Sequence, residues 1–143
     1  MSRLDYILKN KKGSNIGIVQ LYSSLLLYNN IDYELLITSN RYFNRFDPDF
    51  FNPDNLREIL FYIPEIKKYI IPDRKEYRVG EAPFNVLGNY GIYIDKNKNY
   101  YFSTIIENDK KYSTINRTIN VDFKKMQEAL ISETQEFTGH WAI

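Results

Sequence analysis

The sequence contains no cysteine and a single histidine, His140, among its 143 residues. The absence of cysteine excludes a disulfide framework, a thiolate zinc site and a cysteine nucleophile. The single histidine nearly rules out a multi-histidine metal site and a His-based catalytic triad, which would have to use His140 itself. We therefore expect neither a metal nor an organic cofactor.

Long apolar runs and a strong excess of one charge are also missing. No run approaches the roughly 18 consecutive apolar residues that a membrane-spanning helix needs, and the N-terminal residues Met-Ser-Arg-Leu-Asp-Tyr contain no apolar segment typical of a secretory signal. We expect no transmembrane segment, and no signal peptide in this chain. The formal net charge is +1, and the lysines are scattered in pairs, a pattern that argues against a nucleic-acid partner.

The most informative stretch that is present runs from a basic turn into a helix and then a strand. Residues Ile16 to Tyr28 predict a helix that is apolar almost all round, with Ser14 or Asn15 as its N-cap. The two residues Asn29-Asn30 end it, because asparagine tolerates left-handed backbone geometry. Since the helix offers so little polar surface, we expect it to be buried on most sides.

Short elements are expected around this helix. A short helix ending at Asn10 precedes it, and a strand over Ile31–Thr38 follows. Apolar runs at Ile59–Ile63 and Tyr69–Ile71, each followed by proline, predict two further strands. Between the strand ending at Thr38 and the run beginning at Ile59, residues 39–55 carry the Asp, Asn and Pro of turns and predict a loop.

The character changes after Asn89, where strand-like segments alternate with polar turns. Residues 118–123 alternate between apolar and polar side chains, which predicts a strand with one buried and one solvent-exposed face. Lys124 to Gln127 would form the connecting turn. The predicted strands are Tyr90–Ile94, Tyr100–Ile106, Ile115–Phe123 and Ala129–Phe137.

The order of these elements, with Gly13-Ser14-Asn15 before the apolar helix and the run Ile59 to Asp73 after it, resembles the core of bacterial transglutaminase-like proteins. The resemblance implies an α+β fold: a papain-like core with a buried helix on a small antiparallel sheet, plus C-terminal β-strands. It also implies two parts, a degenerate core over residues 1–88 and a β-rich extension over residues 89–143 that begins a following β domain.

In that family the helix begins with a catalytic cysteine, and a histidine and an aspartate lie on the following strands. The corresponding positions here are Asn15, Glu58 and Ile71. Asparagine cannot supply a thiolate and isoleucine cannot orient a base, so the cysteine-dependent reaction of the family cannot take place. The resemblance therefore implies a catalytically inactive domain, not an enzyme, with a structural or a ligand- or protein-binding role.

The resemblance further implies a larger exported bacterial protein, located in the periplasm or at the cell surface, with neighbouring β domains as partners. Two other functions stay open. Tyr42, Phe43 and Phe46, with nearby phenylalanines, would form a platform for a glycan or peptide if their rings are exposed. Alternatively, Glu58 paired with Asp47 or Asp49 would suit a carboxylate-dependent hydrolase if the two carboxylates share a cleft.

Overall fold

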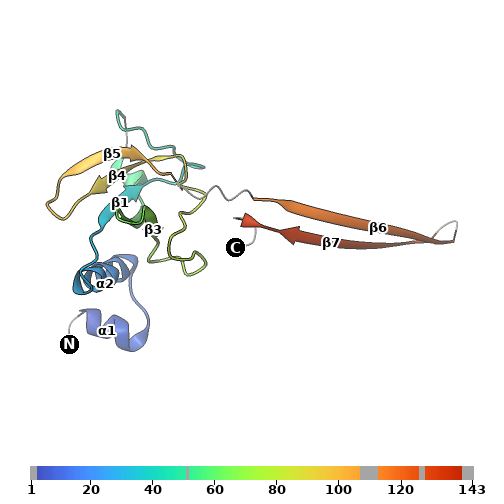
Figure 1. The fold of residues 1–143 in the computed structure, drawn as a ribbon, viewed down its shortest axis with the longest axis horizontal. Helices are drawn as coiled ribbons and strands as arrows, with labels where there is room; N and C mark the ends of the chain where they lie inside the picture. Colours follow the sequence, from blue (N-terminus) through green and yellow to red (C-terminus); the bar gives the residue numbers. More distant parts are fainter. Residues whose placement is uncertain (1–2, 51, 107–112, 126–127, 140–143) are drawn as a thin grey trace. The chain divides into compact units, whose positions relative to one another are not determined.

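The computed structural model describes residues 3–50, 52–106, 113–125 and 128–139. The chain divides into two compact units, Met1–Asn108 and Asp109–Ile143. The first unit contains two helices and a five-stranded sheet, and the second contains a two-stranded sheet (Figure 1).

The two helices are α1 (Arg3–Asn10) and α2 (Asn15–Tyr28). Ser14 is the N-cap of α2, and its side-chain oxygen accepts a hydrogen bond from the Gly17 amide at 3.3 Å. At the other end Asn29 is the C-cap, and Asn30 takes a positive φ of 54°. The predicted start and end of this helix are confirmed, because local capping chemistry determines both.

The prediction that α2 is buried on most sides is wrong. Only Gly17 and Leu26 are buried, while Leu27 is 59% exposed and Tyr28 is 86% exposed. One face of the helix packs on the sheet through Leu26 and Tyr22, which lie against Phe61. An apolar sequence favours burial, but burial also requires a second element to cover the opposite face, and none of the described segments does so completely.

The five strands of the first sheet are all antiparallel to their neighbours, in the order β3-β2-β1-β4-β5. Loop residues 39–57, which include the short 3-10 helix η1 (Pro53–Asn55), connect β1 to β2. The strands are β1 (Glu34–Thr38), β2 (Glu58–Ile63), β3 (Lys68–Ile70), β4 (Tyr90–Ile94) and β5 (Tyr100–Thr104).

Alternation of side chains along these strands gives the sheet two covered faces. Leu35 lies opposite Phe61 in the register, on the face that receives α2. Leu36 lies opposite both Leu60 and Tyr93, on the other face. There the core is completed by residues from the segment after β3, and its buried members are Leu36, Leu60, Tyr69, Ala82, Val86, Tyr93 and Ile105.

The predicted papain-like α+β core is wrong. Seven strands in two sheets dominate the described residues, with only two helices, and α2 is not the enclosed centre that such a core requires. The expected division after residue 88 lies between β3 and β4, which are strands of one sheet. The main contact boundary instead falls between Asn108 and Asp109.

The second unit is a hairpin of β6 (Ile115–Lys125) and β7 (Glu128–Phe137), so both predicted strands are present. The register is irregular between Phe123 and Lys125. Of the predicted turn, Met126 and Gln127 lie outside the described residues. The expected buried face is wrong, because every described strand residue is exposed; two strands have no second layer of their own to bury it against.

Among the described segments, no helix combines the length and the apolar character that crossing a membrane requires.

Candidate functional site

The three positions suggested by the transglutaminase resemblance lie on three different elements. Asn15 is the first residue of α2 and is exposed. Glu58 is the first residue of β2, and Ile71 follows β3 directly and packs against the core. Among the described residues, no hydrogen bond or ion pair joins Asn15 to Glu58. These positions therefore do not form a connected polar group.

Glu58 instead belongs to a partly buried polar cluster. Nη2 of Arg74 donates to both carboxylate oxygens of Glu58, at 2.9 and 2.7 Å. The side-chain amide of Asn85 donates to Oε1 at 3.2 Å. Both oxygens thus have donors from inside the fold, and the negative charge is compensated by a guanidinium. This arrangement holds the carboxylate in one orientation at the start of β2.

Glu58 also borders a cavity of about 470 Å³ between the loop after β1 and the start of β2. We call this cavity the polar pocket. A smaller cavity of about 210 Å³ adjoins it, shares Ser39, Asn44 and Asn55 with it, and is bordered also by Arg45 and Phe50. The residues that line the polar pocket are Ser39, Asn40, Phe43, Asn44, Asn55, Arg57 and Glu58.

A buried asparagine holds the loop that forms the wall of this pocket. Asn89 is 0% exposed, and its side-chain amide donates to the Ser39 carbonyl at 2.9 Å. Its side-chain oxygen accepts from the backbone amide of Phe46, also at 2.9 Å. One side chain therefore ties two points of the loop, on either side of Phe43 and Asn44, to the sheet. The Ser39 hydroxyl adds a hydrogen bond to the Asn44 carbonyl at 2.5 Å.

The predicted aromatic surface divides into exposed and buried rings. Phe43 is 84% exposed and borders the polar pocket. Tyr42 is exposed beside Phe84, with ring centroids 6.0 Å apart and planes inclined at 56°. Phe46 is only 3% exposed and packs near Phe102 in the fold. Of the nearby phenylalanines, Phe50 is exposed and Phe51 lies outside the described residues.

Several polar groups of the pocket lack partners within the described parts of the chain. The side-chain amides of Asn44 and Asn55 make no hydrogen bond there, and the amide nitrogen of Asn40 donates none. Arg57 uses only Nε, which donates to the Asp54 carbonyl at 3.0 Å. Donors and acceptors are thus available to a ligand around one exposed ring.

Comparison with family models, curated proteins and solved structures gave no match.

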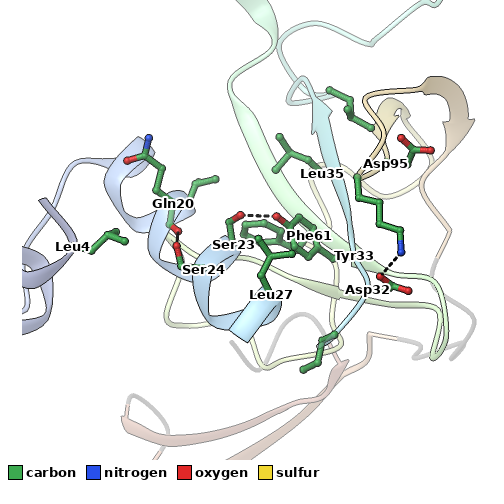
Figure 2. Close-up of a pocket in the computed structure, with 14 residues that line it drawn as sticks. Leu4, Gln20, Ser23, Ser24, Leu27, Asp32, Tyr33, Leu35, Phe61 and Asp95 are labelled. Carbon is green, nitrogen blue, oxygen red and sulfur yellow. Dashed lines mark hydrogen bonds and ion pairs between the residues drawn. The ribbon is translucent and has the colours of Figure 1, made fainter. Parts of the chain in front are cut away.

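A third cavity, of about 560 Å³, lies between α2 and the sheet (Figure 2). We call it the α2 groove. Leu27, Leu35 and Phe61 form apolar walls, and a hydrogen bond of 2.5 Å joins the hydroxyls of Ser23 and Tyr33 across it. Sequence reasoning missed this groove, although the absence of charge along α2 was a signal that could have indicated it.

Charged residues lie at one rim of the α2 groove. Lys96 Nζ lies 3.0 Å from a carboxylate oxygen of Asp32. The neighbouring Asp95 accepts hydrogen bonds from the side chain of Asn99 and from the amides of Asn99 and Asn97, and these donors lower its pKa below the ordinary value. The hydrogen bonds of Asp95 close the turn between β4 and β5, and the Lys96–Asp32 ion pair joins this turn to the segment before β1.

No group of three or more His, Cys, Asp or Glu residues within the described ranges is arranged to hold a metal ion. Asp47 and Asp49, considered above as partners for Glu58, lie in a turn in which Oδ1 of Asp47 accepts from the Asp49 amide at 3.0 Å. Neither aspartate lines the polar pocket. Of the described residues, Glu58 is therefore the single carboxylate at that pocket's wall.

Proposed function

We propose that this chain is a non-catalytic carbohydrate-binding module, and that the polar pocket is its binding site. The observation that carries the proposal is the combination of uncommitted side-chain amides, Asn44 and Asn55, with the exposed ring of Phe43 around one cavity. Sugars present hydroxyl groups that both donate and accept hydrogen bonds, together with C–H faces that pack on aromatic rings. Amides and a ring meet both requirements.

The preorganisation of the pocket supports binding. Asn89 fixes the loop that carries Phe43 and Asn44, and Arg74 fixes Glu58. A ligand that enters a site already held in one geometry loses less free energy to ordering the protein. A binding role with no chemistry step is consistent with this design.

The same geometry does not favour the hydrolase alternative. Two carboxylates about 5–10 Å apart flank the bond in most glycoside hydrolases. Within the described ranges the polar pocket has one carboxylate, Glu58, and donors from Arg74 and Asn85 occupy both its oxygens. The exported location and the neighbouring β domains implied by the resemblance stay predictions.

A titration of the full chain with a panel of neutral and acidic oligosaccharides tests the proposal. We expect saturable binding by calorimetry to at least one sugar, weakened about tenfold or more by Phe43→Ala because a stacking surface is lost. The matched control is Phe123→Ala, the same change at a phenylalanine of β6 that is also exposed. Binding that survives Phe43→Ala, or a panel with no binding sugar, would reject the proposal.

A further inference from the structure

We propose that the sugar held in the polar pocket is acidic, carrying a carboxylate or a sulfate ester that Arg57 and Arg45 bind. This inference rests on the proposed function, and it names the class of ligand. It follows from the charges that line the polar pocket and the smaller cavity beside it.

Among the residues that the structure describes, the charged ones lining these two cavities are Arg45, Arg57 and Glu58. The charge of Glu58 is compensated from within the fold by Arg74, whose Nη2 lies 2.7 Å from Oε2. Within the described ranges, neither Arg45 nor Arg57 makes an ion pair. Two positive charges are therefore left at cavities that share three of their lining residues, and the complementary ligand is an anion.

The conformation of Arg57 suits it to this role. Its Nε–H donates to the Asp54 carbonyl at 3.0 Å, which restrains the side chain at the start of β2. The two terminal nitrogens remain as a planar pair of donors. Such a pair matches the two oxygens of a carboxylate or sulfate and forms shorter, stronger hydrogen bonds with them than with a neutral hydroxyl.

The amides around the arginines indicate that the anionic group is part of a sugar. A small free anion would be satisfied by the guanidinium groups alone and would leave Asn44, Asn55 and the Phe43 ring without a role. An acidic sugar uses all three, because its hydroxyl groups reach the amides while its ring lies on Phe43. The pocket therefore combines charge recognition with recognition of hydroxyl groups.

The test compares two probes that differ in charge and by one methyl group per sugar: a tetramer of galacturonic acid and its fully methyl-esterified form. We expect the full chain to bind the acid at least about tenfold more tightly than the ester, with the difference shrinking at high salt. A sulfated galactose oligomer and its desulfated form make a second pair, which distinguishes a sulfate ester from a carboxylate as the source of the charge.

The outcomes separate this inference from the proposed function. Equal binding of the charged and neutral members of both pairs would overturn the inference and leave carbohydrate binding intact. No binding by any oligosaccharide would overturn both. Inorganic sulfate that binds as tightly as the charged sugars would also overturn the inference, because the sugar part would then contribute nothing.

Substitutions of single arginines test which side chain recognises the negative charge of the ligand. Arg57→Ala should remove most of the preference for the acid, and Arg57→Lys should restore part of it, since lysine keeps the charge but lacks the planar pair of donors. The control is Arg78→Ala, which removes the same charge from another exposed arginine. If the control lowers affinity as much as Arg57→Ala, the net charge of the chain explains the preference and the inference fails.

Discussion

Asn89 is the residue whose side chain does most to shape the proposed site, although it does not line it. It is fully buried and makes hydrogen bonds to two points of the loop between β1 and β2, the Ser39 carbonyl and the Phe46 amide. A buried amide with all its partners in place is well tolerated, whereas removing it leaves a buried donor and a buried acceptor without partners. The loop geometry therefore depends on this one side chain.

We expect Asn89→Ala to lower the free energy of unfolding by about 2–4 kcal/mol, the cost of leaving two buried backbone groups unsatisfied. Urea unfolding followed by circular dichroism measures this change. Asn97→Ala, at an exposed asparagine in the turn after β4, is the control and should stay within about 0.5 kcal/mol of the parent. Equal effects of the two substitutions would show that Asn89 does not anchor the loop.

At the scale of elements, α2 shows that an apolar residue of a helix need not be buried. Its sequence carries no charged residue, yet adjacent leucines differ sharply in environment. Leu26 packs with Phe61 and Ile63 against the sheet, while Leu27 is exposed at the wall of the α2 groove. The sheet covers one stripe of the helix, and that stripe supplies the packing energy.

Paired substitutions of these leucines test this orientation. Leu26→Ala should cost about 2–4 kcal/mol, because it leaves a cavity in the packed face. Leu27→Ala removes the same atoms from an exposed position and should cost less than about 1 kcal/mol. Thermal or urea unfolding of the two variants gives both values. A larger loss for Leu27→Ala would mean that the helix packs on the sheet through the side that carries Leu27 and not through the side that carries Leu26.

Local chemistry explains which elements the sequence could predict. The ends of α2 follow from Ser14 and Asn29-Asn30, and β2 and β3 are marked by apolar runs that precede prolines. Tertiary contacts explain the failures. Phe43 and Phe46 lie three residues apart in the same loop, but only Phe46 meets the sheet. The polar pocket depends on Arg74 and Asn85, whose approach to Glu58 is not visible in a linear sequence.

At the scale of the whole chain, the contacts divide between Asn108 and Asp109. β4 pairs with β1, which precedes it by more than fifty residues, so the first sheet is complete only when β4 and β5 are included. The hairpin of β6 and β7 has two strands only, and an isolated two-stranded sheet is marginally stable in water.

Three fragments test this division. We expect residues 1–108 to unfold cooperatively with native-like circular dichroism, because they contain the complete five-stranded sheet. Residues 1–88 should fail to fold, since β1 loses its β4 neighbour. Residues 109–143 alone should show little persistent strand. A cooperatively folded 1–88 fragment would contradict the account and favour the division expected from the sequence.

The most direct test of the central claim is a ¹H–¹⁵N nuclear magnetic resonance titration of the full chain with the acidic oligosaccharide. We predict saturable shift changes concentrated at Phe43, Asn44, Asn55 and Arg57, which line the polar pocket. Changes confined to residues of the α2 groove, such as Ser23 and Leu27, or no changes at all, would contradict it.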